Sequence, residues 1–334
     1  MLHTRRWFLS CLAGMLAAVS VGTAQAEAPG FAIEQTAKGV AVKVGGQPFA
    51  EYVINDSEPN KTYLWPVYGP TGKAMTRAFP MAKVDGEVQD HYHHRGICFG
   101  QEDIGGWDTW TERLTFDIGE NTKPAQKERL KKIGTEKHRC FKQLLVCPDK
   151  AVIESELDYI GQDGKRVATE LRTMTFRVEN GQRLIDLDQQ FIASDGEVTF
   201  GDKKDAGLSI RVPTSMSVDS KKGGKIVNSE GLTDAAAWGK KAKWCDYHGP
   251  VDGEHLGVAV LNHPSSFRHP TTWHVRTYGL FTANPFGTLD KEQPNGPHTL
   301  KPGEKLLLKH RYVFHEGDEK AAKIAEAYER YAKE

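Results

Sequence analysis

The sequence has no excess of charge of either sign: its 44 lysines and arginines are matched by 44 aspartates and glutamates. Proteins that bind nucleic acid or an anionic membrane surface electrostatically carry a basic excess or a basic patch. We therefore expect neither partner. The chain also lacks internal repeats, low-complexity tracts and linkers, and its composition leaves the oligomeric state open.

Cysteine is scarce as well. One of the five cysteines, Cys11, lies near the N-terminus, and the other four are Cys98, Cys140, Cys147 and Cys245. So few thiols exclude a disulfide scaffold in a chain of 334 residues, and none has the CxxC spacing of a redox or metal motif. A bridge between Cys140 and Cys147 across a tight connection is the pairing that an oxidising compartment would permit.

Long apolar runs are missing except for one near the start, from Cys11 to Val21. Arg5 and Arg6 precede this run, and Ala24-Gln25-Ala26 provides a small-x-small cleavage site. This pattern predicts a twin-arginine signal peptide over residues 1–26 and a periplasmic or secreted protein. The run is too short to cross a hydrocarbon core of about 30 Å, and no later segment reaches spanning length, so we expect no membrane association after cleavage.

Short segments with alternating apolar and polar residues fill the rest of the chain. Around Ile153 and Leu157 the apolar positions alternate with acidic ones, and Asn180-Gly181 provides a hairpin turn further on. We read these acidic residues as the solvated face of an antiparallel sheet rather than as catalytic groups. From Asp318 the spacing changes to that of an amphipathic helix. We predict one all-β domain over residues 27–334 with a helix at its C-terminus.

A dense histidine segment, residues 90–96, reads Asp-His-Tyr-His-His-Arg-Gly. If the backbone is extended here, His91, His93 and Arg95 share one face and His94 lies on the other. Imidazoles titrate near neutrality, so this face could transfer protons or hold a metal, and the guanidinium could bind an anion. The alternative is a set of mutually hydrogen-bonded polar residues at a strand end.

A second histidine stretch, residues 262–284, repeats the combination of imidazole, guanidinium and aromatic groups. Two distant segments with the same chemistry predict two walls of one pocket. The residues that we expect the second stretch to contribute are His263, His269, Trp273, His274, Arg276 and Asn284.

Three shorter regions add further candidates. Trp107 follows two glycines, and an indole face stacks well on the C–H face of a sugar, although core packing is an equally good explanation. The run 201–213 offers Lys204, Asp205 and Arg211 if its strand end faces the pocket; a solvated turn is the alternative. The run 238–249 offers Asp246 and Tyr247 between aromatic neighbours.

Several of these motifs together resemble a known family. The segment 90–96, the strand Gly207 to Val212, the run Trp244 to Gly249 and the second histidine stretch are similar to the uncharacterised bacterial family often labelled "methane oxygenase PmoA". Tyr92 and Ala206 depart from its pattern. The label conflicts with physics, because a membrane oxygenase subunit needs spanning helices that this chain lacks. In architecture the family resembles the galactose mutarotase-like β-supersandwich, which implies an antiparallel all-β fold and carbohydrate ligands.

The leading hypothesis is an exported protein that binds or transforms a sugar or oligosaccharide by acid–base chemistry, of epimerase, lyase or hydrolase type, without a cofactor. Its expected acid–base groups are His91, His93, His94, His274, Asp205 and Asp246, and its expected sugar-binding groups are Arg95, Trp107, Lys204, Arg211, Tyr247, His263, His269, Trp273, Arg276 and Asn284. A divalent metal at His91 and His93 defines a second hypothesis, although no HExxH motif is present. A sugar-binding module without catalysis is a third.

Overall fold

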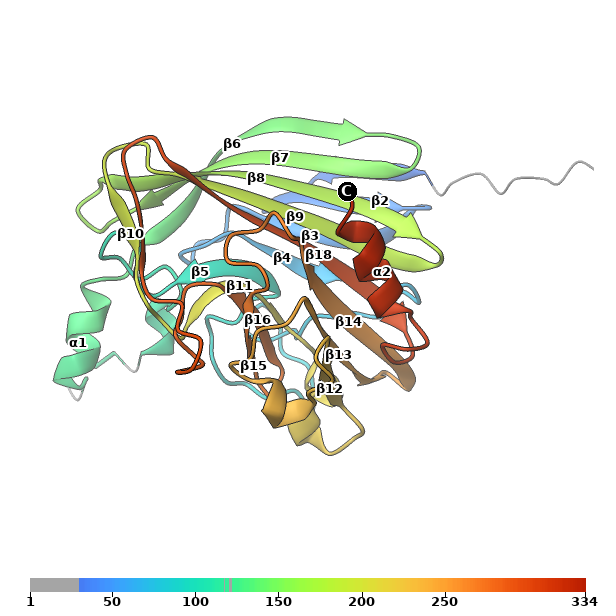
Figure 1. Cartoon of the computed structure of the whole chain (residues 1–334). Helices are drawn as coiled ribbons and strands as arrows, with labels where there is room; N and C mark the ends of the chain where they lie inside the picture. Colours follow the sequence, from blue (N-terminus) through green and yellow to red (C-terminus); the bar gives the residue numbers. More distant parts are fainter. Residues whose placement is uncertain (1–29, 117, 120–121) are drawn as a thin grey trace, which may run out of the picture.

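In the computed structural model (Figure 1), residues 30–116, 118–119 and 122–334 are described. The predicted signal peptide, residues 1–26, lies outside these residues. Strands are much more common than helices in the described chain, and almost all of the strands belong to two eight-stranded antiparallel sheets.

The first sheet contains the N-terminal strands and three strands from the second half of the chain. Strand β5 pairs with both β4 and β11, so the chain that follows the histidine segment lies in the middle of this sheet. In spatial order the strands are β1 (Phe31–Gln35), β2 (Gly39–Val44), β3 (Gln47–Val53), β4 (Tyr63–Val67), β5 (Ile97–Gln101), β11 (Ala206–Arg211), β16 (Leu280–Asn284) and β15 (Thr272–Val275).

The second sheet contains the long hairpins that the alternating pattern predicts. The turn between β8 and β9 is made by Asn180 and Gly181, whose φ angles of 52° and 78° suit this dipeptide. In spatial order its strands are β12 (Lys225–Asn228), β13 (Trp244–Val251), β14 (Glu254–Asn262), β18 (Lys305–Glu316), β9 (Gln182–Ile192), β8 (Arg166–Glu179), β7 (Lys150–Ile160) and β6 (Thr135–Val146). A separate pair is formed by β10 (Val198–Phe200) and β17 (His298–Leu300).

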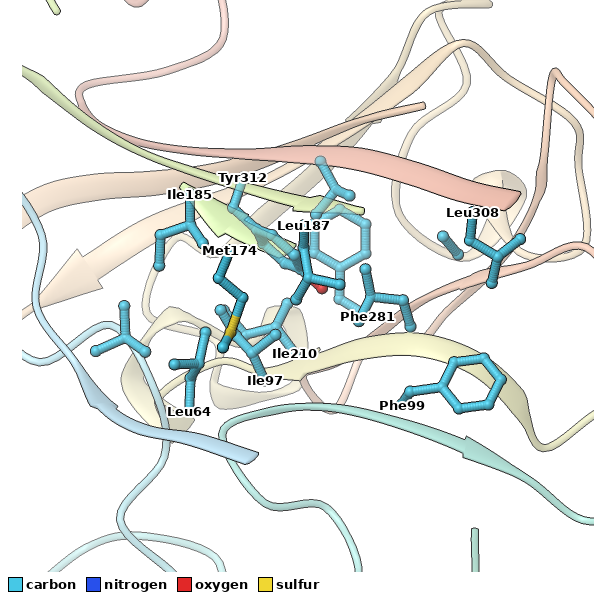
Figure 2. Packing of buried hydrophobic residues seen from close by; sticks show 14 of the residues in the cluster. Leu64, Ile97, Phe99, Met174, Ile185, Leu187, Ile210, Phe281, Leu308 and Tyr312 are labelled. Atoms are coloured by element: carbon cyan, nitrogen blue, oxygen red, sulfur yellow. The ribbon is translucent and has the colours of Figure 1, made fainter. Parts of the chain in front are cut away.

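The hydrophobic core fills the space between the inner faces of the two sheets. Figure 2 shows Ile97, Phe99 and Ile210 of the first sheet facing Met174 and Leu187 of the second. Aromatic rings also meet across the interface, with ring centroids 4.8 Å apart for Phe99 and Phe191. Because side chains alternate along a strand, the neighbours of these core residues point to the outer faces.

Helices are few and short. Helix α2 (Ile324–Tyr331) packs on the outer face of the second sheet, where its buried Ile324, Tyr328 and Tyr331 meet Leu261 and Val313. None of the described helices is long and apolar enough to cross a membrane. The others are α1 (Pro124–Leu130) and the 3₁₀ turns η1 (Arg113–Thr115), η2 (Thr214–Met216), η3 (Val218–Ser220) and η4 (Asp234–Ala237).

The predicted fold class is confirmed: the protein is an all-β, antiparallel two-sheet sandwich with a C-terminal helix. Two details differ. The helix begins at Ile324 rather than Asp318, because residues 319–323 form turns. Cys140 and Cys147 are both free thiols, so the bridge that their spacing permits is not made.

Candidate functional site

The histidine segment is not extended, which corrects the predicted alternation of its side chains. His91 has a φ of 45°, and the backbone turns so that His94 N–H donates to the His91 carbonyl over 3.1 Å. As a result all three imidazoles come together. His91 and His94 are stacked with ring centroids 4.7 Å apart, and His93 meets His94 edge-on at 4.4 Å.

A pocket of about 200 Å³ opens at these rings on the outer face of the first sheet. Strands β5, β11 and β15, which lie close together in this sheet (Figure 1), supply its other walls from the residues next to their ends. The pocket is lined by His91, His93, His94, Glu102, Trp110, Thr111, Thr115, Arg129, Lys204, Asp205, Arg276 and Tyr278.

Asp90 holds the histidine segment in place beside the pocket. Its carboxylate accepts hydrogen bonds from Arg77, from Arg211 Nη2 at 2.9 Å, and from His91 Nδ1 at 2.9 Å. Burial raises the pKa of Asp90, but the hydrogen bond from His91 and the two arginine charges outweigh it and hold the pKa well below its ordinary value. Asp90 is therefore an ionised anchor for the histidine segment and for the end of β11.

The two buried imidazoles are neutral. Arg211 Nη1 lies 3.3 Å from His94 Nδ1, and because a guanidinium can only donate, Nδ1 accepts and the proton of His94 is on Nε2. Burial, followed by the proximity of His93 and the charge of Arg211, holds the pKa of His94 well below its usual value. His93 has its Nδ1 2.9 Å from the Thr115 hydroxyl, and burial and the charge of Lys61 lower its pKa strongly as well.

Two carboxylates face the imidazoles across the pocket. Pairing of Gln101 in β5 with Ala206 in β11 places Glu102 and Asp205 beside each other at adjacent strand ends. Burial, and next the charge of Asp205, raise the pKa of Glu102 to about 6, although Arg129 donates to it at 2.7 Å. Glu102 is thus the pocket carboxyl that changes charge close to neutral pH.

The lining residues that the sequence did not predict are Glu102, Trp110, Thr111, Thr115, Arg129 and Tyr278. For Glu102 a signal existed: Ile97, Phe99 and Gln101 alternate into the core, so the carboxylate one step further on faces outward like Asp205. Arg129 lies in the short helix α1, and no local pattern in its sequence indicates that it borders the pocket.

The second histidine stretch does reach this pocket, through its later part. Arg276 lines it directly, with its guanidinium 5.7 Å from the ring centroids of Trp238 and of Tyr278. His274 is buried behind the lining, where its Nε2 lies 3.7 Å from Asp205 and its Nδ1 accepts from Trp238 Nε1 at 3.3 Å. Burial and the charge of Arg276 lower the pKa of His274 to about 3.

Three predicted sugar-binding residues instead hold the scaffold. Arg95 is 1% exposed and forms a bidentate ion pair with the buried Glu112. Trp273 points into the core and donates to the Ala242 carbonyl at 2.9 Å. Asn284 donates to the carbonyls of residues 203 and 204, so it shapes the loop that carries Lys204 and Asp205.

Three others lie away from the pocket. His263 and His269 pack against helix α2: the ring of His263 lies 5.0 Å from that of Tyr331, and His269 Nε2 is 3.0 Å from the Tyr328 hydroxyl. Trp107 covers Gly161, where an added Cβ would come within 2.3 Å of the indole. These three side chains pack against other parts of the protein. The prediction that both histidine stretches line one pocket along their whole length is therefore wrong for His263 and His269.

Asp246 and Tyr247 are separated from the pocket and from each other by the alternation of β13. Tyr247 faces the core, and its hydroxyl donates to the Thr277 carbonyl at 2.9 Å. Asp246 faces outward and lies 2.7 Å from His248 Nδ1 and 2.7 Å from His315 Nε2. It belongs to a second polar cluster, on the other sheet.

The second hypothesis, a divalent metal at His91 and His93, is not matched by a ligand cluster among the described residues. Among the described residues, the group of three whose ligand atoms all lie within 4.8 Å of one another is Asp246, His248 and Glu319. In the pocket, the Nδ1 atoms of His91, His93 and His94 are directed to Asp90, Thr115 and Arg211 instead.

These features define a class of protein: a two-sheet antiparallel β-sandwich with a histidine-lined pocket on one outer face. Residues 39–329 match the model of a family of unknown function, DUF6807, and the chain belongs to this family. No curated protein matches it significantly.

Solved structures similar to this chain include three sugar-related proteins. A polysaccharide lyase is 13% identical, with 81% of this chain and 33% of that chain covered and a TM-score of 0.31. An α-galactosidase from Geobacillus stearothermophilus is 11% identical, with 86% and 40% covered and a TM-score of 0.38. A galactose mutarotase related enzyme from Lactobacillus acidophilus is 10% identical, with 86% and 95% covered and a TM-score of 0.33. The chain thus spans about a third of the lyase, and likenesses this distant carry no functional argument.

Proposed function

We propose that this protein binds a small carbohydrate in the pocket at His91, His93 and His94 and transforms it by general acid–base chemistry. The observation that carries the proposal is the opposition, across about 200 Å³, of neutral imidazoles and a carboxyl whose pKa is about 6. Catalytic acids and bases work best when their pKa lies near the working pH.

The other lining groups suit a sugar ring. Trp110 and Tyr278 provide aromatic surface for C–H faces, and Lys204 and Thr111 provide donors for hydroxyl oxygens. Pockets for drug-sized ligands measure roughly 300–1,000 Å³. The smaller volume here fits about one sugar unit, as a free monosaccharide or as the end of a chain.

Arg276 favours a sugar that carries an acidic group. Arg129 is paired with Glu102 and Asp108, and Lys204 lies 3.5 Å from Asp205. Within the described part of the chain Arg276 forms no salt bridge, yet its guanidinium is held between two aromatic rings. A positioned guanidinium without an acidic partner is suited to bind a carboxylate.

In this mechanism Glu102 exchanges a proton with the reacting carbon or oxygen. His94 donates a hydrogen bond to a neighbouring oxygen through Nε2–H, and His93 offers its Nε2 as a donor or an acceptor according to its tautomer. Epimerase, lyase and hydrolase reactions share this proton transfer. We also propose that the reaction takes place outside the cytoplasm, on the strength of the twin-arginine pattern before residue 26.

The test is an NMR time course of the protein with neutral sugars and uronic acids, including freshly dissolved single anomers and short oligosaccharides. We expect one of them to change, and Glu102→Gln and His93→Ala to slow that change at least a hundredfold. His269→Ala is the matched control, because its ring lies at helix α2. Unchanged turnover in Glu102→Gln would contradict the role of Glu102 in proton transfer. Saturable sugar binding without any turnover would instead indicate a sugar-binding module without catalysis.

A further inference from the structure

The Asp246 cluster, composed of Asp246, His248, His315 and Glu319, lies on the outer face of the second sheet. Asp246 and His248 are on β13, His315 is on β18, and Glu319 is in the turns that lead to helix α2, which packs against this sheet (Figure 1). We propose that Asp246, His248 and Glu319 bind a divalent transition-metal ion of the Zn²⁺ class. The proposal is independent of the sugar pocket on the other sheet.

The donor atoms are already close to the spacing that a metal needs. His248 Nδ1 lies 2.7 Å from Asp246 Oδ1 and 3.8 Å from Glu319 Oε2, and all three ligand atoms lie within 4.8 Å of one another. Bonds of about 2.0–2.2 Å in a tetrahedral site put ligand atoms about 3.4 Å apart. A metal that replaces the proton between His248 and Asp246 requires these separations to change by at most about 1.4 Å.

The sequence of β14 allows the two imidazoles of the cluster to approach Asp246. His248 and His315 lie opposite each other across Gly257 of β14, which is the register partner of both. A Cβ at position 257 would come within 2.2 Å of the His315 ring and 2.9 Å of His248 Cβ, so only glycine lets both imidazoles approach. His315 Nε2 then contacts Asp246 Oδ2 at 2.7 Å, while its Nδ1 contacts the Glu316 carbonyl at 3.2 Å. Such contacts orient a carboxylate ligand.

The two carboxylates of the cluster have only imidazoles as ion-pair partners among the described residues. Asp246 is fully buried and the Glu319 side chain is 13% exposed, yet within the described residues no lysine or arginine forms a salt bridge with either. Their partners are imidazoles. Buried carboxylates are normally paired with a cation or a metal.

The donor set decides the class of ion. One imidazole nitrogen and two carboxylate oxygens suit Zn²⁺ and its transition-metal neighbours, whereas Ca²⁺ takes about 6–8 oxygen ligands. A cavity of about 640 Å³ adjoins His248 and Glu319 and leaves room for water in the remaining coordination position. Bound metal would also tie the turns before α2 to the sheet.

The experiment uses the full chain, purified without a histidine tag, stripped with a chelator and titrated with Zn²⁺, Mn²⁺ and Ca²⁺ by calorimetry. We expect one Zn²⁺ per chain, weaker Mn²⁺ binding and no Ca²⁺ binding, with a melting temperature that rises with Zn²⁺ concentration. Glu319→Gln should weaken Zn²⁺ binding at least tenfold. Glu326→Gln, a carboxylate that lines the same cavity, should leave it unchanged.

Three results would overturn the proposal. The first is Zn²⁺ binding weaker than roughly 0.1 mM in the parent protein. The second is unchanged affinity in Glu319→Gln. The third is loss of affinity in His93→Ala, which would place the ion in the sugar pocket. Glu319 lies in a surface turn, so its variant remains informative even if Asp246→Asn, altered at a fully buried position, does not fold.

Discussion

At the scale of single residues, the surroundings of each titratable side chain in the pocket set its protonation state. His93 and His94 are buried among cationic neighbours, which keeps both imidazoles neutral. Asp90 is surrounded by donors and stays ionised. The pKa of Glu102 is shifted in the opposite direction, because burial and the charge of Asp205 both disfavour its ionised form. The acid–base assignments follow from these differences in surroundings, which separate the pKa values of two carboxyls whose ordinary pKa values are similar.

Asp205→Asn should lower the pKa of Glu102 from about 6 toward its ordinary value of about 4.5. The substitution removes the charge that repels the ionised form of Glu102, while the burial of Glu102 remains. Carboxyl ¹³C NMR titration measures the midpoint, with Glu102→Gln used to assign the signal.

Asp205→Asn should also shift the pH dependence of the reaction rate in a defined direction. If Glu102 acts in its protonated form, activity falls as the pH rises through about 6, and Asp205→Asn moves that fall to lower pH. Asp290→Asn is the control, because Asp290 is paired with Lys240 away from the pocket lining. An unchanged Glu102 midpoint in Asp205→Asn would show that the two carboxyls are not coupled.

At the scale of elements, the strand ends of the first sheet carry the pocket and helix α2 covers the second sheet. The helix has only eight residues, so its stability comes from the buried side chains on one face rather than from its own hydrogen bonds. Ile324, Ala327, Tyr328 and Tyr331 supply that face. This spacing is visible in the sequence, which is why the helix could be predicted.

Ile324→Ala should lower the free energy of unfolding by about 2–5 kcal/mol, because it leaves a cavity between α2 and the sheet. Ile324 is fully buried in the cluster that joins the helix to β14 and β18. Urea unfolding followed by circular dichroism measures the loss. Glu329→Ala, on the exposed face of the same helix, should change stability by about 0.5 kcal/mol or less. Equal losses in both variants would mean that helix propensity, rather than docking, stabilises this element.

At the scale of the whole molecule, the two sheets share one core. Phe99 of the first sheet packs on Phe191 of the second, and Phe49 packs on Phe176 with ring centroids 5.4 Å apart. Neither sheet can expose this face to water without losing the hydrophobic contribution that stabilises both. The single domain that the sequence predicts therefore implies cooperative unfolding.

Unfolding of the described domain should be a single transition, with the same midpoint by circular dichroism and by tryptophan fluorescence. Phe191→Ala should lower its free energy by about 3–5 kcal/mol in both signals, since the lost ring contacts both sheets. Phe191→Leu retains most of the apolar volume and should lose less. Separate midpoints for the two signals would indicate that the sheets unfold independently.

The alternation of apolar and polar residues determined much of this protein before any tertiary contact was known. It defined antiparallel strands, the hairpin at Asn180, the solvated acidic faces and the C-terminal helix, because each depends on the period of side chains along one segment. The local concentration of histidine and arginine also identified the histidine segment and Arg276 as chemically unusual.

Only the tertiary structure decided which of these groups meet. The turn at His91 gathers rings that an extended strand would separate, and the pairing of β5 with β11 brings Glu102 beside Asp205 from about a hundred positions away. Arg95 and Trp273 have the same side-chain chemistry as pocket residues but are used by the core. A sequence specifies the chemistry of each side chain locally, whereas long-range strand register determines the partners that give the side chain its function.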